Sequence, residues 1–538
     1  MTDVLIVGAG PTGLTLACDL ARRGLAIRIV DRSPVHPRTS RSKGPNPRSL
    51  EVLEDLGVAE EVLAAGSAPL PMRKYRDGAP VADTDPYAGS APTPDAPYDR
   101  GRLIAQWRLE EILRDRLAGY GVAVETGTEV VGLTDEGTSV TVTLADGSGA
   151  SARYVVGCDG AHSRVRKLLG VPFEGETAED QVMVCGDVEI DPGVLDRTVW
   201  HQWFDEDGAV MLCPVPGTRT GWWFQAGPER DAEGRPLAPS TDGFRRLFAR
   251  HTRLPAAHLT EATLLSTYRV NVRMADRYRV GRVLLAGDAA HVHAIAGGLG
   301  MNTGIQDAFN LGWKLAQVVR ERAGEELLDT YGEERLPVAA RTLDLTSDRL
   351  RATLEAIRRP GGGLDSAVTP SMSGLDVGYR WSSLARPGAG GGPRSGDRAP
   401  DAPCVMAATG RPTRLFRAFA GPHLTVLGFG DGTARALREA AETHGDAVRT
   451  VRVYAAGAAE PGTAAVGPDA LHDREGLARA AYGIGRDTVV VIRPDNHVGL
   501  ISDTEGFDDV RRYLDVLDGA REPDPMSVAG MVDGTRKG

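Results

Sequence analysis

Lysine, cysteine and long apolar runs are scarce in this chain of 538 residues, and each shortage excludes a class of protein. Lysine occurs only at positions 43, 74, 167, 314 and 537, and the net charge is -11, which argues against a nucleic-acid binder held by broad phosphate contacts. The N-terminus has no charged segment followed by a long apolar stretch, and no run of about 18 apolar residues is present, so we predict neither secretion nor a membrane span.

The cysteines are also few and scattered, at positions 18, 158, 185, 213 and 404. They form no CxxC pair and no Cys/His cluster at zinc spacing, so we predict no metal site. Buried thiols in a reduced, cytoplasmic protein are the simplest interpretation. The length allows three or four domains.

A glycine-rich turn follows directly on the first apolar run. The run at 4–7 predicts a buried parallel strand, residues 8–13 read GAGPTG and match GxGxxG, and residues 14–23 predict a helix that ends at Gly24. A second strand at 25–30 ends at Asp31. This strand–turn–helix–strand order is typical of a dinucleotide-binding unit and makes a chance glycine turn the weaker interpretation.

Each glycine of the turn is needed for a different steric reason. Gly8 permits the tight turn, Gly10 lets the backbone approach a pyrophosphate, and Gly13 lets the helix pack on the strand. The helix N-terminus faces the phosphates, and Asp31 lies where a carboxylate accepts hydrogen bonds from a ribose. This motif alone does not separate NAD from FAD.

Two later segments have the same strand-then-turn form. Residues 154–158 predict a strand that leads into Asp159-Gly160 and a basic helix start at 163–166. Residues 281–286 predict another buried strand, which ends in Gly287-Asp288 and continues through a glycine loop into a helix at about 303–320.

With these three motifs in this order, the sequence resembles the flavoprotein aromatic hydroxylases, the p-hydroxybenzoate hydroxylase-like group A monooxygenases, over roughly residues 1–350. The resemblance implies an FAD that NADPH or NADH reduces as a transient co-substrate. O2 then adds at the flavin C4a position, and the resulting hydroperoxide transfers one oxygen atom to a small-molecule aromatic substrate. Such chemistry needs little acid/base equipment from the protein, and the sequence identifies no catalytic side chain.

The resemblance also implies contacts to FAD. Asp288 would contact the ribityl or phosphate region of FAD. Backbone groups of residues 300–302 would lie near the flavin O2 and N1, and Asp159 and Arg166 would lie on the path by which NAD(P)H approaches. Arg32 would lie at the adenosine end of FAD, and the backbone of Val130 would contact the adenine. Arg41 and Lys43 would line the path of the flavin or the nicotinamide, and Gln106 would contact the chain that carries the flavin ring. The predicted cofactor-binding residues are Gly8, Gly10, Thr12, Gly13, Asp31, Arg32, Arg41, Lys43, Gln106, Val130, Asp159, Asp288, Gly298, Gly300, Met301 and Asn302.

The glycine loop departs from the family at two positions. Ile295 stands where a proline is usual and Leu299 where a glutamine is usual. The loss of proline reduces the rigidity of this backbone. Baeyer–Villiger insertion therefore stays open beside hydroxylation.

Other side chains have plainer interpretations. We expect His162 and His291 to form local hydrogen bonds, and Glu110 and Glu111 to lie on a solvated helix face. The middle region predicts strands at 182–185, 209–212 and 220–224 and holds many of the aromatic residues. These either line a wall of a substrate pocket or fill an ordinary sheet core: Trp200, Trp203, Phe204, Trp222, Trp223 and Phe224.

We expect an α/β fold with a Rossmann-like FAD-binding domain at 1–172 and 276–360 and a sheet-containing substrate domain at 173–275. A glycine- and proline-rich linker follows at 361–396. Residues 397–538 predict strands at 423–429, 451–454 and 488–495 and a helix at 432–443, and resemble the thioredoxin-like C-terminal domain of the larger aromatic hydroxylases. Without CxxC, a structural or assembly role is expected, and a homodimer is one option.

The combined prediction is an NAD(P)H-dependent FAD monooxygenase that hydroxylates a polycyclic, polyketide-type aromatic. The long middle region and the C-terminal unit motivate this choice of substrate. Three alternatives stay open: Baeyer–Villiger oxygenation, inactivation of an aromatic antibiotic, and a flavin-binding protein without oxygenase activity.

Overall fold

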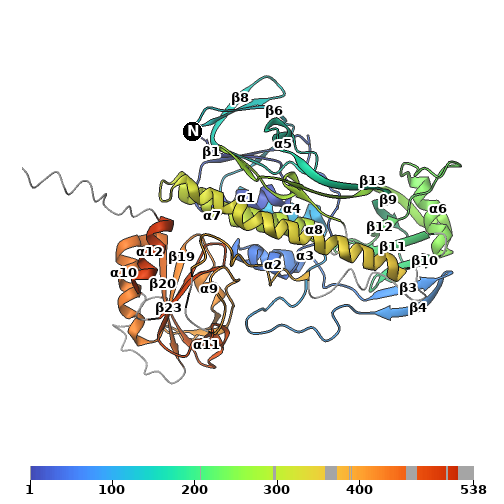
Figure 1. The fold of residues 1–538 in the computed structure, drawn as a ribbon. Coiled ribbons are helices and arrows are strands. Elements are labelled where there is room, and N and C mark those ends of the chain that lie inside the picture. Colours follow the sequence, from blue (N-terminus) through green and yellow to red (C-terminus); the bar gives the residue numbers. More distant parts are fainter. Residues whose placement is uncertain are drawn as a thin grey trace, which may run out of the picture. The chain divides into compact units, whose positions relative to one another are not determined.

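The computed structural model describes residues 2–205, 208–294, 298–357, 372–386, 388, 391–455, 469–503 and 507–518. The chain divides into two compact units, residues 1–312 with 331–377 and residues 313–330 with 378–538 (Figure 1). Ile295 and most of the glycine-rich part of the predicted linker lie outside the described residues. No helix among the described residues is both long enough and apolar enough to cross a bilayer.

The first sheet of the larger unit brings the three sequence motifs to one edge. Its path is β14-β15-β8-β1-β2-β5, with β6 and β7 attached through β8, and β15, β8, β1 and β2 run parallel. Because the carboxyl ends of adjacent parallel strands meet at one edge, the turns after β1, β8 and β15 lie side by side. The strands are β1 (Thr2–Val7), β2 (Ile27–Val30), β5 (Val124–Glu125), β6 (Val130–Asp135), β7 (Val140–Leu144), β8 (Gly149–Gly157), β14 (Arg279–Val280) and β15 (Val283–Leu285).

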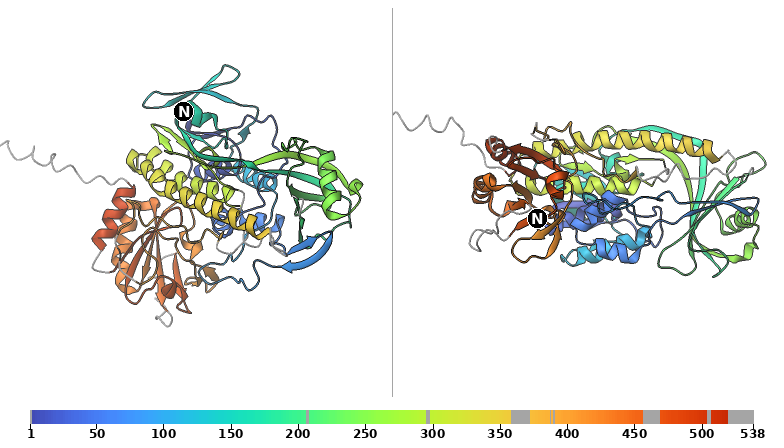
Figure 2. Two further views of the ribbon diagram at one scale, coloured as in Figure 1. Left: turned by 45° about the vertical axis from the view of Figure 1, so that its right-hand side comes forward. Right: turned by 90° about the horizontal axis from the view of Figure 1, so that it is seen from below.

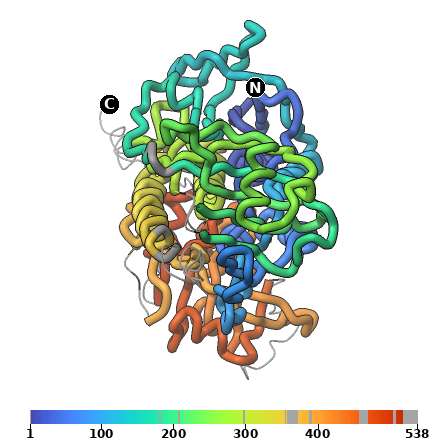
Figure 3. The backbone as a smooth tube through the Cα atoms, turned by 90° about the vertical axis from the view of Figure 1, so that its right-hand side faces the viewer, coloured from blue at the N-terminus to red at the C-terminus, as the bar shows by residue number. Residues whose placement is uncertain are grey.

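Residues 173–275 leave this sheet along β9 and return along β13, which pair antiparallel over most of their length; Figure 3 traces this excursion in green. The second sheet has the order β16-β13-β9-β12-β11-β10-β3-β4. Its strands are β3 (Met72–Arg76), β4 (Ala79–Thr84), β9 (Phe173–Ile190), β10 (Trp200–Asp205), β11 (Gly208–Pro214), β12 (Gly221–Ala226), β13 (Leu259–Ala275) and β16 (His291–Val292).

Helix α6 (Thr241–Thr252) covers one face of the second sheet (Figure 2). Phe244 and Phe248 of α6 join the buried core beneath it, and alternate residues of each strand point toward them because side chains alternate along a strand. The opposite face of β9 is less covered: residues 183, 185, 187 and 189 are only half-buried, while 182, 184, 186 and 188 are buried.

The remaining helices of the larger unit surround the first sheet. Helix α1 begins at Pro11, directly after the glycine turn, and α7 begins at Gly300, close to the predicted start. The helices are α1 (Pro11–Arg22), α2 (Pro47–Asp55), α3 (Ala59–Ala65), α4 (Gln106–Ala118), α5 (Arg164–Leu168), α7 (Gly300–Val319) and α8 (Asp329–Ile357), α7 and α8 crossing the unit boundary.

The smaller unit is built on a sheet of order β18-β17-β21-β20-β19-β22-β23. The predicted βαβ pattern is confirmed, since β19 and β20 are parallel and α10 connects them. Cys404 is buried in its core, which raises the pKa of the thiol to about 12 and keeps it unreactive. The kinship with thioredoxin stays a prediction. Its elements are β17 (Pro403–Met406), β18 (Pro412–Arg414), α9 (Phe416–Phe419), β19 (Leu424–Phe429), α10 (Ala434–His444), β20 (Val448–Ala455), β21 (Ala470–Asp473), α11 (Leu477–Ala481), β22 (Thr488–Ile492), β23 (Val498–Asp503) and α12 (Phe507–Asp518).

Candidate cofactor and substrate site

At two glycines of the N-terminal turn the surrounding backbone leaves no room for a side chain, and at the third the space is empty. A Cβ at Gly8, whose φ is +105°, would lie 2.4 Å from the Cys158 carbonyl oxygen, and a Cβ at Gly13 would lie 2.0 Å from the Gly8 carbonyl oxygen. Around Gly10 nothing lies within 4 Å of such a Cβ. Gly10 is the N-cap of α1 and provides no side-chain cap, so the first N–H groups of the helix, from Thr12 on, are available to an anion. This cradle fits a pyrophosphate.

Asp31 fastens the same turn from the end of β2. Its Oδ2 accepts a hydrogen bond from the Ala9 N–H at 2.8 Å, and its Oδ1 accepts one from the Ser33 N–H at 2.8 Å. Thr128 N–H donates to the Asp31 carbonyl at 2.8 Å, which brings the start of β6 at Val130 close by. Arg32 is exposed beside them. The residues predicted for the adenosine end are therefore neighbours.

Thr12 joins the glycine turn to the third motif. A Cβ at Gly287 would lie 2.5 Å from Thr12 Oγ1, and a Cβ at Gly304 of α7 would lie 2.3 Å from the same oxygen. Thr12 thus packs between the Gly-Asp turn and α7, where only glycine leaves room for it.

Asp159 accepts hydrogen bonds from the start of the short helix α5, whose N-cap is Ser163. Its carboxylate accepts hydrogen bonds from Ser163 Oγ at 2.5 Å, Arg164 N–H at 2.6 Å and Val165 N–H at 3.1 Å. These bonds make the Asp-Gly motif a rigid turn at the end of β8. Its predicted role in the approach of NAD(P)H stays a prediction.

Arg166 links the second motif to the third. Its guanidinium donates to the Ala289 carbonyl at 2.8 Å and the Ala161 carbonyl at 2.9 Å, and lies 3.7 Å from the centre of the Phe173 ring. Burial lowers the pKa of Arg166, but guanidinium stays charged at neutral pH. One buried cation therefore holds two of the three motif turns together.

Asp288 is the acidic residue of the third motif and faces outward. The side chain is exposed to solvent. The protein around it nevertheless raises the pKa of the carboxyl, and this effect outweighs the positive charges of His291 and Arg41, which lower the pKa. No described residue donates a hydrogen bond to this carboxylate, whereas Arg41 is exposed and close enough to act on it electrostatically. An unused acceptor in this position fits a ribityl hydroxyl.

The start of α7 is tied to two loops by Asn302. Its Oδ1 accepts from the Asn46 N–H at 2.8 Å, and its Nδ2 donates to the Gly298 carbonyl at 2.9 Å. A Cβ at Gly298 would meet nothing within 4 Å, so this part of the loop is open. The structure thus places Gly298, Gly300, Met301 and Asn302 at one helix start, and Leu299, the described departure from the family, is buried among them.

Gln106 anchors the loop at 40–44. Its N–H donates to Ser40 Oγ at 3.0 Å, its Oε1 accepts from the Arg41 N–H at 3.2 Å, and its Nε2 donates to Glu110 Oε1 at 2.8 Å. The prediction that Glu110 lies on a solvated face was wrong. The first turn of α4 packs under this loop, and burial raises the pKa of Glu110 to about 7.

The aromatic residues of the second sheet divide between its two faces. Trp203, Trp222 and Phe224 pack in the core beneath α6, whereas Trp200 and Trp223 lie on the opposite face. We call this opposite side the inner face. Both groups are buried in apolar clusters, and a wall of a substrate pocket stays a prediction.

The inner face also receives Lys43. Its Nζ donates to Gln225 Oε1 at 3.1 Å and lies 5.3 Å and 5.9 Å from the ring centres of Trp200 and Trp223. The predicted contact of Lys43 with the cofactor stays a prediction, while its ammonium group lies on the second sheet.

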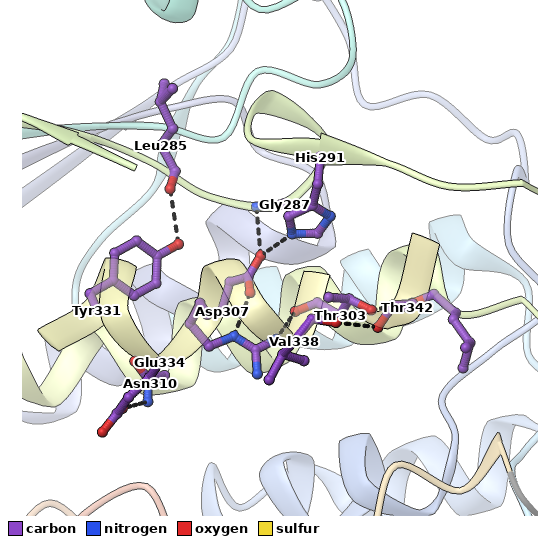
Figure 4. Close-up of polar contacts among 12 residues, drawn as sticks. Leu285, Gly287, His291, Thr303, Asp307, Asn310, Tyr331, Glu334, Val338 and Thr342 are labelled. Atoms are coloured by element: carbon purple, nitrogen blue, oxygen red, sulfur yellow. Dashed lines mark hydrogen bonds and ion pairs between the residues drawn. The ribbon is translucent and has the colours of Figure 1, made fainter. Parts of the chain in front are cut away.

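Figure 4 shows a buried network that the sequence did not reveal. Asp307 of α7 accepts from the Gly287 N–H at 3.1 Å, from His291 Nε2 at 2.6 Å and from Arg335 Nε at 2.7 Å. The local hydrogen bonding predicted for His291 is confirmed. The sequence contained one indication of this network: Asp307 lies between Ile305 and Phe309 in a strongly apolar helical segment.

A family described as an FAD binding domain matches residues 1–346. A flavin-dependent monooxygenase of Mycobacteroides abscessus is 42% identical over 79% of this chain and 88% of its own. The 6-methylpretetramide 4-monooxygenase of Streptomyces rimosus is 34% identical and covers 100% of this chain and 98% of its own. The structure of aklavinone-11 hydroxylase with FAD and aklavinone superposes with a TM-score of 0.79 at 27% identity, over 96% of this chain and 99% of that chain. The chain therefore belongs to the FAD-binding family of flavin-dependent monooxygenases.

Proposed function

We propose that this chain is an NAD(P)H-dependent FAD monooxygenase that hydroxylates a polycyclic aromatic compound of polyketide type. The observation that carries the proposal is that three features meet at one edge of the first sheet: an uncapped helix start, the Asp288 carboxylate, to which no described residue donates, and the start of α7. Its relatives include an enzyme named for 6-methylpretetramide and a hydroxylase solved with aklavinone. Hydroxylation is consistent with these relatives, and they do not favour the three alternatives.

Bound FAD would supply the transfer of electrons from NADPH or NADH and the activation of O2. The chain's own residues would hold it. Gly10 and the α1 N-terminus would receive the pyrophosphate, Asp31 a ribose and Asp288 the ribityl chain. The positive end of α7 at Gly300 would face the flavin and favour negative charge on it.

The substrate would lie against the inner face of the second sheet. The half-buried side chains of β9 at 183, 185, 187 and 189, two of which are acidic, lie on this face beside the buried Trp223 of β12. The protein would orient the ring system and exclude water, which is the main task it has in such a reaction. Gln106 would keep the loop that carries Arg41 in place between this surface and α4.

Purified full-length protein tests the proposal. We expect one FAD per chain by absorbance, and oxidation of NADPH or NADH that accelerates when polycyclic phenols are added. A protein that carries no flavin and binds none at micromolar FAD would refute the proposal.

A further inference from the structure

His293 connects the buried Asp307 network to the start of α7. Its Nε2 lies 2.9 Å from His291 Nδ1, and His291 Nε2 in turn donates to the Asp307 carboxylate at 2.6 Å (Figure 4). A Cβ at Gly300 would lie 3.9 Å from His293 Cδ2, so the ring packs against the first residue of α7. We call His291 and His293 the histidine pair. The pair thus reaches from the buried acid to the helix start that would face the flavin.

The positions of the protons in the histidine pair follow from Asp307. Burial raises the pKa of the Asp307 carboxyl, but Arg335 and His291 outweigh burial, so the group is ionised and can only accept hydrogen bonds. His291 therefore carries its hydrogen on Nε2, its Nδ1 accepts from His293 Nε2–H, and His293 Nδ1 is left with a lone pair. This Nδ1 is buried, and no described residue forms a hydrogen bond with it. Because a buried polar atom normally has a partner, the chain of bonds ends in an unused proton acceptor.

This chain of hydrogen bonds can move a positive charge inward while both rings stay in place. A proton that binds His293 Nδ1 lets His293 pass its Nε2 hydrogen to His291 Nδ1, and His291 becomes an imidazolium that faces the Asp307 carboxylate. Burial lowers the pKa of His293 well below its usual range, and the positive charges of His291 and Arg335 act in the same direction. A charge is therefore unfavourable on His293, whereas the buried carboxylate stabilises it on His291.

The other polar side chains around the histidine pair do not offer this path. The Tyr278 ring lies 6.0 Å from the His291 ring, and burial raises the pKa of its phenol well above the usual range, so it stays protonated. The Tyr268 hydroxyl donates to the His293 carbonyl at 3.0 Å. Asp288 is exposed to solvent. Proton exchange at this buried position therefore depends on the two imidazoles.

The proposed reaction consumes one proton. One substrate C–H group, O2, NAD(P)H and one proton give C–OH, water and NAD(P)+. Hydride transfer would bring two electrons and one hydrogen to the flavin and would add one negative charge beside the start of α7. The second hydrogen of the water has to come from solvent. An added negative charge raises the proton affinity of a nearby imidazole, so the reduction of the flavin and the uptake of this proton favour each other.

We propose that the histidine pair takes up this proton from solvent at His293 Nδ1 when the bound flavin is reduced, holds it as the His291 imidazolium, and returns it when O2 accepts the electrons. The inference rests on the proposed function and assigns a place in the protein to the proton that the reaction consumes. The charge on the pair would add to that of the positive end of α7 in stabilising the reduced flavin.

The pH dependence of the flavin midpoint potential tests the proposal without turnover. The FAD-loaded full-length enzyme would be titrated by spectroelectrochemistry between about pH 6 and pH 9, a range that starts near the usual pKa of histidine. Each proton taken up with two electrons lowers the potential by about 30 mV per pH unit. In the wild type we expect a two-proton slope over part of this range, and in His293→Gln a one-proton slope throughout. The glutamine can still donate a hydrogen bond to His291, but it binds no proton.

His258→Gln is the matched control and should retain the two-proton slope. His258 also pairs with an aspartate, since its Nδ1 lies 3.0 Å from Asp191 Oδ2, but its side chain is 35% exposed. A one-proton slope in the wild type at every pH would overturn the proposal, and so would a two-proton slope that persists in His293→Gln.

A second measurement needs no variant. In wild-type enzyme with 15N-labelled histidine rings, the spectrum should show one unprotonated ring nitrogen fewer after reduction of the flavin, and an unchanged number would also overturn the proposal. Flavin content and NADPH oxidation are measured on the same samples. Absence of bound flavin in the wild type would refute the proposed function, whereas bound flavin with a one-proton slope would refute the proton site alone.

Discussion

The imidazole of His291 donates a hydrogen bond of 2.6 Å from Nε2 to the Asp307 carboxylate, and both side chains are completely buried. The same carboxylate pairs with Arg335 and accepts from the Gly287 N–H (Figure 4). A single acid therefore ties the Gly-Asp turn to α7 and α8. Because Gly287 precedes Asp288, the position of the proposed ribityl contact depends on this network.

Asp307→Asn should destabilise the larger unit by about 3–5 kcal/mol at pH 7, since it removes the carboxylate that forms a buried ion pair with Arg335. Burial raises the pKa of Asp307, but Arg335 and His291 outweigh burial and hold it below its usual range. The stabilisation is therefore present at neutral pH and lost as the pH falls below about 4. Thermal melts at pH 7 and at about pH 2.5 check this, with Asp348→Asn, 72% exposed, as control. Equal melting of the variant and wild type at pH 7 would contradict it.

Gly10→Ala should weaken FAD binding at least about tenfold, or 1.4 kcal/mol, and leave the melting temperature of the apoprotein unchanged. The added methyl meets no protein atom within 4 Å, so its clash would be with the cofactor. Quenching of flavin fluorescence measures the affinity. Gly485→Ala, equally unobstructed but in the smaller unit, should leave FAD affinity at the wild-type value. Unchanged affinity in Gly10→Ala would place the pyrophosphate elsewhere.

Asp288→Asn should also lower FAD affinity, by about tenfold, because a charged acceptor binds a hydroxyl more strongly than an amide does. No described residue relies on this carboxylate, and the protein around it already raises its pKa, so the apoprotein should not lose stability. Calorimetric titration with FAD and apoprotein melts separate the two effects. A drop in melting temperature with FAD affinity intact would give Asp288 a structural role instead.

Glu110→Gln should stabilise the protein at high pH. Burial raises the pKa of Glu110 from 4.5 to about 7, so its ionisation costs folding free energy as the pH rises between these values, about 3 kcal/mol in all. The variant keeps an oxygen for Gln106 and should melt a few degrees above the wild type at pH 8 and level with it at pH 4.5. Glu111→Gln on the same helix should show no such gain. A pH-independent difference would rule out titration of Glu110.

The sequence predicted the α/β class and the three motif turns because each turn depends on local features: an apolar strand, a glycine at a crowded position and a helix start. As expected, a side chain at Gly8 or Gly13 would clash with neighbouring backbone atoms. The strands of the middle region and the βαβ pattern of the C-terminal unit were predictable from their apolar runs in the same way.

What the sequence could not reveal depends on contacts between distant segments. Glu110 follows a helical pattern that is compatible with solvent, and its burial comes from the loop at 40–44. Arg335 lies 28 residues from its partner Asp307. The side of the sheet on which each tryptophan lies depends on register, which one residue of shift would reverse.

The incorporation of oxygen from labelled O2 tests the central claim most directly. The FAD-loaded enzyme would be incubated with NADPH or NADH, 18O2 and a panel of polycyclic phenols, and the masses of the products would be measured by mass spectrometry. The account predicts a product that gains one oxygen atom, that atom being 18O, in a reaction that depends on FAD. Oxidation of NADPH that yields only peroxide across the panel, or a product whose new oxygen comes from water, would contradict it.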